Sequence, residues 1–377
     1  MRAVKYSRRA SGVVWTLFLA LACVLSLAAA LAAGAEASAT TPGADVYHGS
    51  KLPNDPLIGR QWELASRASM RAPQAWDRVV GGPVTVAVID SGIDLTHPDL
   101  AANLWTNQRE VAGNGIDDDG NGYVDDVHGY DFVAGDGDPT DELGHGTEVA
   151  GVIAARGGNG LGIAGVAWRA RIMALRVLDS QDRASSAGMA AAIRYAVANG
   201  ARIVNVSLNG DTRSAAVEEA IIAAQAAGIL VVASAGNDAR DLDTNPSYPA
   251  SYGEDNVIAV GSSGRKGAIS RFSNRSARAL DLLAPGENIL STDREGEYSV
   301  SSGTSMAAPH VTGALALLAS ARPGLSGARL RAALLAGAQP ASIRAGGRRL
   351  DVAAALRAVM PAAKRARISR SNATSRR

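Results

Sequence analysis

The stretch Val84-Thr85-Val86-Ala87-Val88-Ile89, followed directly by Asp90-Ser91-Gly92, decides the fold class of this chain. An unbroken run of β-branched and small apolar residues is typical of a strand buried on both faces, as in a parallel sheet. Similar runs alternate along the chain with alanine-rich stretches of helical length, which predicts a doubly wound α/β fold with helices on both faces of the sheet. The other predicted strands are residues 171–177, 201–208, 229–233 and 256–261, and the predicted helices between them are 185–199 and 214–227.

A second stretch presents a serine at the start of a helix. Gly303-Thr304-Ser305-Met306-Ala307-Ala308-Pro309-His310 places Ser305 between a turn-forming glycine and the helical segment 306–320. The backbone N–H of such a residue lies at the positive end of the helix dipole and can face a developing oxyanion. An isolated Gly-Thr-Ser would more simply be a helix N-cap. The whole octapeptide favours a nucleophile.

A serine nucleophile requires a base and a carboxylate that orients the base. Asp90 follows the strand 84–89, so it lies at the carboxyl edge of the predicted sheet, where ligands bind in such folds. His145 lies in the first turn of a helix of small residues that continues to residue 155. Either residue alone would be an ordinary turn or loop residue. Together with Ser305 they predict an Asp-His-Ser triad.

The chain order of these three residues is that of the subtilisins. The segments Asp90-Ser91-Gly92-Ile93-Asp94, His145-Gly146-Thr147 and 303–310 resemble the signature blocks of the subtilisin-like serine proteases, and the similarity runs from about residue 54 to 338. The opening segments 54–57 and 72–77 most resemble the thermitase branch. The resemblance implies hydrolysis of peptide bonds in protein or peptide substrates, with Asn237 as the side-chain donor of the oxyanion hole.

The resemblance also implies the residues that bind substrate, and the chain departs from the family pattern at three positions. Asn209 stands where a glycine is usual, Ser247 falls at the expected floor of the primary specificity pocket, and Glu148 replaces a second histidine. Because Asn209 and Ser247 are small and uncharged, we expect a medium apolar residue before the scissile bond and a broad specificity. The implied substrate-binding residues are Ser207, Leu208, Asn209, Gly210, Ser234, Ala235, Gly236 and Ser247.

The acidic segment 114–126 is the candidate metal site. Asp117, Asp119 and Asn121 have the alternate spacing of a calcium loop, and Gly122 supplies the sharp turn. The position at which an EF-hand has a bidentate glutamate holds His128, so the segment is no EF-hand and Asp125 or Asp126 is expected to complete the ligand set. The alternative is a solvated acidic turn. The family resemblance implies a second calcium site, with Asp55, Asp99 and Asn159 as its side-chain ligands.

Composition and the chain ends set the wider expectations. The net charge of +2 over 377 residues indicates no nucleic-acid partner, and a monomer is expected. A basic start followed by an apolar run from 12 to 35 predicts a signal peptide over 1–39, hence a secreted or periplasmic protein. An uncleaved membrane anchor is the alternative. Without Cys23, inside that run, the mature chain has no cysteine. The expected organisation is a short linker at 40–53, a peptidase domain at 54–360 and a basic disordered tail at 361–377. Residues 348–359, at the end of the peptidase domain, are expected to form a helix.

Two other functions stay open on the sequence alone. One is a dedicated processing protease that cuts a single partner or precursor, and the other is a catalytically silent binding protein with the same fold. The complete triad and Asn237 argue against the second.

Overall fold

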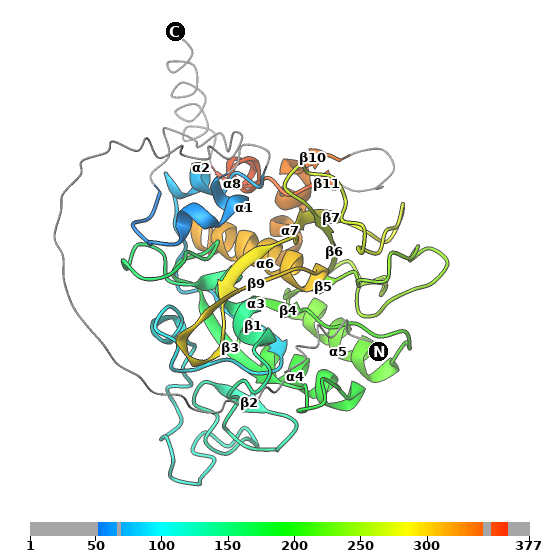
Figure 1. Ribbon diagram of the computed structural model, residues 1–377. Coiled ribbons are helices and arrows are strands. Elements are labelled where there is room, and N and C mark those ends of the chain that lie inside the picture. The colour runs from blue at the N-terminus through cyan, green and yellow to red at the C-terminus, as the bar shows by residue number, and fades with distance from the viewer. Residues whose placement is uncertain (1–51, 66–68, 342–347, 361–377) are drawn as a thin grey trace, which may run out of the picture. The chain divides into compact units, whose positions relative to one another are not determined.

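A computed structural model describes residues 52–65, 69–341 and 348–360 (Figure 1). Its centre is a nine-stranded sheet in the order β10-β11-β7-β6-β5-β4-β1-β3-β2, in which every neighbouring pair except β10 and β11 is parallel. The strands are β1 Thr85–Asp90, β2 Gly129–Asp131, β3 Arg171–Arg176, β4 Ile203–Val206, β5 Leu230–Ser234, β6 Val257–Ser263, β7 Leu282–Pro285, β10 Gln339–Pro340 and β11 Arg348–Arg349. A separate antiparallel hairpin pairs β8 Ile289–Thr292 with β9 Tyr298–Ser301.

Alternate residues of each buried strand face two separate apolar cores. Val86 and Val88 of β1 pack in the core that contains helices α2 Ala72–Trp76, α3 His145–Ala154, α6 Thr304–Ala321, α7 Gly327–Gly337 and α8 Val352–Val359. Ala87 and Ile89 pack in the core that contains α4 Ser186–Ala198 and α5 Ala215–Ala226. A short helix, α1 Trp62–Ala65, contributes Leu64 to the first core. The doubly wound α/β fold predicted from the sequence is therefore confirmed.

The predicted elements agree with the structure at most positions. The strands at 171–177, 201–208, 229–233 and 256–261 correspond to β3, β4, β5 and β6, and the helices at 185–199 and 214–227 correspond to α4 and α5. The helical potential of residues 348–359 is realised only from Val352 onward. Arg348 and Arg349 instead form β11, because their backbone pairs in parallel with Leu282 and Leu283 of β7.

The described residues include no helix that is long and apolar enough to cross a membrane. The proposed signal peptide at 1–39, most of the linker at 40–53 and the basic tail at 361–377 lie outside the described residues.

Candidate active site

Asp90 and His145 form a hydrogen-bonded pair at the carboxyl edge of the sheet. Asp90 is the last residue of β1 and is fully buried, and His145 is the first residue of α3. Asp90 Oδ1 lies 2.6 Å from His145 Nδ1. Because a carboxylate only accepts, Nδ1 carries the proton and the lone pair of the neutral ring is on Nε2, as a general base requires. Burial lowers the pKa of His145, but the charge and hydrogen bond of Asp90, with Glu148 nearby, raise it to about 9.

A buried carboxylate that the sequence analysis missed fixes the start of α3. Asp141 Oδ1 accepts hydrogen bonds from the N–H groups of residues 143 and 144 and from the Ser91 hydroxyl. Its Oδ2 accepts from the N–H and the hydroxyl of Thr147. Ser91 Oγ in turn accepts from the Gly146 N–H at 2.8 Å. These bonds tie the first turn of α3 to the residue after Asp90. An aspartate shortly before a helix is a recognisable start signal.

The backbone N–H of Ser305 and the side-chain amide of Asn237 converge on one small space. That space lies where Gly303 has no side chain: a Cβ there would be 3.4 Å from Asn237 Nδ2, 3.5 Å from Ser305 N and 3.7 Å from Ser305 Oγ. Asn237 Oδ1 accepts from the backbone N–H of Thr304 at 2.8 Å and from its hydroxyl at 2.9 Å. A backbone N–H can only donate, so this contact settles the orientation of the amide and directs Nδ2 to the space.

The carbonyl of Ser305 has no helical hydrogen-bond donor because residue 309 is a proline, and the Ser207 hydroxyl is its donor instead. Pro309 lies within α6 beyond its first turn, where its missing N–H would have bonded the Ser305 carbonyl. Ser207 Oγ donates to that carbonyl at 2.9 Å. Asn205 Nδ2 donates to Ser207 Oγ, and Thr312 Oγ1 donates to Asn205 Oδ1. The backbone of Ser305 is thus held from β4 through a buried polar chain.

Glu148 links the helix of His145 to the hairpin that precedes Ser305. Its Oε1 accepts hydrogen bonds of 2.6 Å from the hydroxyls of Ser299 and Ser301 on β9. Its backbone carbonyl accepts from Ser291 of β8. Burial raises the pKa of Glu148, although the two serine hydroxyls act in the opposite direction. Above that pKa, the carboxylate is a second negative charge near His145.

The implied substrate-binding residues lie on two adjacent segments and one loop beside Ser305. Residues 207–210 follow β4, residues 234–237 end and follow β5, and β4 and β5 are paired in parallel. Ser247 is fully buried and lies one residue before Tyr248, whose N–H and C=O both bond the backbone of Gly210.

The acidic segment contributes only part of the expected ligand set. Carboxylate oxygens of Asp117, Asp119 and Glu110 lie within 4.8 Å of one another, so the structure adds Glu110, which precedes the acidic run. Asp125 instead accepts from backbone N–H groups of residues 113–115. Asp126 is fully buried and accepts from the hydroxyl of Tyr195 and the amides of Asn107 and Asn121. Asp125 and Asp126 bond these other groups and do not belong to the cluster of Glu110, Asp117 and Asp119, so their part in a ligand set stays a prediction.

The residues of the second implied calcium site do lie together. Asp55 accepts from the backbone N–H groups of Gly158 and Asn159, and Asn159 Nδ2 donates to Asp99 at 2.7 Å. Asp55 is 2% exposed and Asp99 is 1% exposed. Burial raises the pKa of Asp55, and the negative charge of Asp99 adds to this effect.

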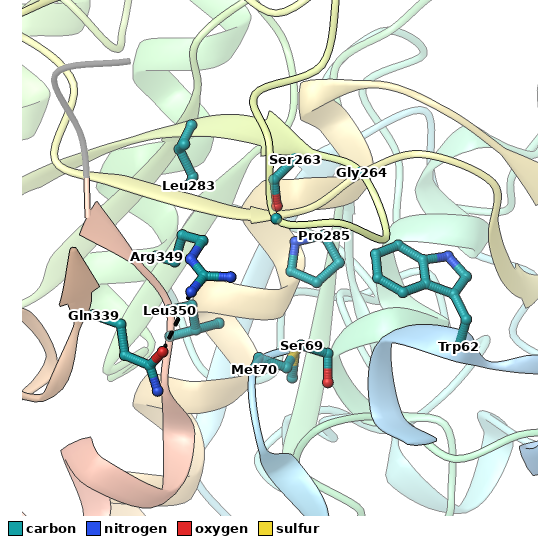
Figure 2. A pocket seen from close by; sticks show the side chains of 11 residues that line it. Trp62, Ser69, Met70, Ser263, Gly264, Leu283, Pro285, Gln339, Arg349 and Leu350 are labelled. Carbon is teal, nitrogen blue, oxygen red and sulfur yellow. Dashed lines mark hydrogen bonds between the residues drawn. The ribbon is translucent and has the colours of Figure 1, made fainter. Parts of the chain in front are cut away.

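A separate pocket is lined by residues of β6, β7, β10 and β11, on the side of the sheet that ends at β10 (Figure 2). It contains none of the site residues described above. Trp62, Pro285 and Met70 contribute apolar surface, and Arg349 donates a hydrogen bond of 3.4 Å to Gln339.

A doubly wound sheet with a histidine bonded to a buried aspartate and a serine at a helix start is the arrangement of a serine hydrolase. The model of the subtilase family matches residues 81–363. Thermitase of Thermoactinomyces vulgaris is 38% identical over 283 residues, covering 75% of this chain and 90% of that protein. The major intracellular serine protease of Bacillus subtilis is 41% identical, covering 67% of this chain and 73% of that protein.

The solved structures agree with these sequence matches. A protease of Pseudoalteromonas arctica superposes with a TM-score of 0.70 at 30% identity, covering 82% of this chain and 100% of that one. The chain belongs to the subtilase family, and it is a subtilisin-like serine endopeptidase.

Proposed function

We propose that the protein is an exported endopeptidase of broad specificity in which Ser305, His145, Asp90 and Asn237 carry the reaction. Ser305 Oγ attacks the carbonyl carbon of the scissile peptide bond and gives its proton to His145 Nε2. The carbonyl oxygen becomes an oxyanion that accepts hydrogen bonds from Ser305 N and Asn237 Nδ2. Asp90 holds the imidazole in its Nδ1–H tautomer and stabilises the imidazolium.

The second half of the reaction uses the same groups. His145 donates its proton to the leaving nitrogen as the C–N bond breaks, which leaves an acyl group on Ser305. Water then attacks the carbonyl carbon of this ester while His145 takes one proton of the water. The bond between the acyl carbon and Ser305 Oγ breaks, and His145 returns the proton to Oγ, which restores the serine. The products are a carboxylate and an amine.

The observation that carries this proposal is the convergence at Gly303. Two N–H donors from distant parts of the chain and the Ser305 hydroxyl surround one space of atomic size. A structural N-cap serine would not need a second donor, the Asn237 amide, beside the space that its own N–H borders, and the Asp90–His145 bond supplies the base that such a serine would lack.

Calcium is proposed as a structural ion. Three carboxylates, Glu110, Asp117 and Asp119, present oxygen ligands within 4.8 Å, and oxygen donors of this kind suit a hard divalent cation. Asp55, Asp99 and Asn159 form the second proposed site, where a cation would offset the repulsion between two buried carboxylates. Neither ion takes part in the chemical steps.

Substitution of the nucleophile tests the proposal. Ser305→Ala should abolish peptide hydrolysis and leave the melting temperature nearly unchanged, because only one oxygen is removed. Phenylmethylsulfonyl fluoride should label the wild-type protein at Ser305, identified by peptide mass. Ser302→Ala, on an exposed neighbouring serine, is the matched control and should still be labelled at Ser305. Hydrolysis that survives in Ser305→Ala would refute the mechanism.

A further inference from the structure

We propose that the side chain of Asn209 closes the substrate slot beside Ser305 and restricts the residue on the acyl side of the scissile bond to a small, uncharged side chain. This inference rests on the proposed function and narrows the broad specificity stated there at this one position of the substrate. The slot is the space between a first wall, residues 207–210, and a second wall, residues 234–237, and Ser247 lies at its bottom.

The slot must receive that substrate residue because of how its two walls are attached. Ser207, in the first wall, donates to the Ser305 carbonyl. Asn237, in the second wall, holds Thr304 and directs its amide to the space at Gly303. A substrate carbonyl oxygen placed in that space brings its own Cα and side chain between the two walls. The width of the slot therefore selects the side chain.

Asn209 spans this width. Its Nδ2 donates a hydrogen bond of 3.2 Å to Ser247 Oγ at the bottom of the slot. The same nitrogen lies 3.2 Å from the position that a Cβ would take at Gly236, in the opposite wall. Because such a Cβ would stand about 1.5 Å from the Gly236 Cα, the amide nitrogen is at most about 4.7 Å from that Cα, which leaves no room for another atom between the amide and the second wall. The amide thus reaches from one wall to the other.

The position of the amide is held by the backbone around it. Gly210 N donates to Tyr248 O at 2.9 Å, and Tyr248 N donates to Gly210 O at 2.8 Å. These two bonds form an antiparallel bridge that fixes the segment of Asn209 against the segment of Ser247, and the Asn209 side chain reaches across it to the Ser247 hydroxyl. Ser247 is itself fully buried, and its N–H donates to the Ser251 hydroxyl. Displacing Asn209 would leave the buried Ser247 hydroxyl without this donor, which opposes the displacement.

Size and charge both follow from this closure. None of the residues in the two walls or at the bottom is ionisable, so the slot holds no carboxylate to pair with arginine or lysine. The remaining room suits glycine, alanine or serine. This is smaller than the medium apolar residue expected from the sequence, because the sequence does not reveal where the Asn209 amide lies.

The experiment compares four proteins on one series of peptide nitroanilides that differ only in the last residue: alanine, leucine, phenylalanine and lysine. Wild-type protein should have its highest kcat/KM with alanine. Asn209→Gly should raise the phenylalanine-to-alanine ratio of kcat/KM by about 10-fold or more, since a pocket distinguishes side chains by about 10–200-fold per methylene-sized change. Asn209→Ala should give an intermediate ratio, and Asn209→Asp, which keeps the shape of the amide, should still favour alanine.

Several results would overturn the inference. They are a wild-type preference for phenylalanine or leucine, an Asn209→Gly ratio within twofold of the wild-type value, or a gain in lysine cleavage for Asn209→Asp without a preference for alanine. Melting temperatures of all variants identify any that fail to fold, and Asn209→Ala then carries the comparison. If wild-type protein cleaved none of the peptides, this result would instead contradict the proposed function. Failure of the inference and failure of the proposed function are therefore distinguishable.

Discussion

Gly303→Ala should fill the proposed oxyanion hole without disturbing the fold. The new methyl group would lie 3.4 Å from Asn237 Nδ2 and 3.5 Å from Ser305 N, in the space that the oxyanion must enter. The backbone at this position has φ 169° and ψ 165°, an extended conformation that alanine adopts as readily as glycine. Its shortest contacts are ordinary van der Waals distances. The substitution therefore acts on the reaction and not on folding.

The size of the effect follows from the number of donors that are blocked. Removal of one oxyanion-hole donor costs about 10²–10³ in kcat, or about 2.7–4 kcal/mol, a magnitude measured in a related subtilisin. A methyl group at Gly303 separates the oxyanion from both donors, so kcat should fall by at least about 10³-fold. The free energy of unfolding should stay the same or rise by about 0.4–1 kcal/mol, because alanine restricts the unfolded chain.

The assay is steady-state hydrolysis of an alanine nitroanilide, with the melting temperature measured on the same samples. Gly253→Ala is the matched control, because its methyl group would meet no atom within 4 Å, and it should retain wild-type kcat. A Gly303→Ala protein that keeps more than about a tenth of wild-type kcat would show that the oxyanion does not occupy this space. A large fall in melting temperature would show that the space is not open.

Three further predictions concern charge. Glu148→Gln removes a negative charge near His145 and so lowers the pKa of the imidazole, which is about 9 in the wild-type protein. Because kcat/KM rises with pH as the imidazole loses its proton, this acid limb of the pH–rate profile should move to lower pH. An acid limb at the wild-type pH would contradict the prediction. Calcium at a hundredfold excess over Kd should stabilise inactive Ser305→Ala protein by about 2.7 kcal/mol per site, measured as a higher melting temperature. Joint Asp117→Asn and Asp119→Asn substitution should reduce this increase. Equal melting curves in calcium and in chelator would exclude the ion. Glu63 is buried, and burial raises its pKa from 4.5 to about 8. Between these pH values the folded state keeps a proton that the unfolded state releases, so the free energy of unfolding should decrease as the pH rises from 4.5 to about 8. In the same inactive background Glu63→Gln should flatten that fall in chemical denaturation, and parallel curves would refute the assignment.

Local patterns predicted most of the fold, because the residue pattern of most segments favours the same secondary structure that the segment adopts in the fold. The run that ends at Asp90 forms a strand that is buried on both sides, and its alternate residues divide between two cores. The miss at Arg348 and Arg349 has a different origin. Their helical propensity is overridden by backbone pairing with β7, a partner more than sixty residues earlier, and no local pattern encodes that pairing.

The candidate site divides in the same way. The sequence indicated Asp90, His145, Ser305 and Asn237 through their motifs, and the structure places Asn237 beside Ser305 and Asp90 beside His145. It did not indicate Glu110, which only the folded loop brings to Asp117 and Asp119. It also could not show that Asp126 is engaged by Tyr195, since that contact joins the acidic loop to α4. Contacts between segments distant in sequence account for these differences.

The spacing of the four proposed reacting groups along the chain has a consequence for biogenesis. Asp90, His145, Asn237 and Ser305 come from four different elements, and the chain must be synthesised through residue 305 and its parallel sheet assembled before they meet. Parallel sheets with such non-local pairing form late and slowly. A nascent or partly folded polypeptide therefore has no catalytic centre, so proteolytic activity appears only with the completed native state, and the folding barrier itself delays the onset of cleavage.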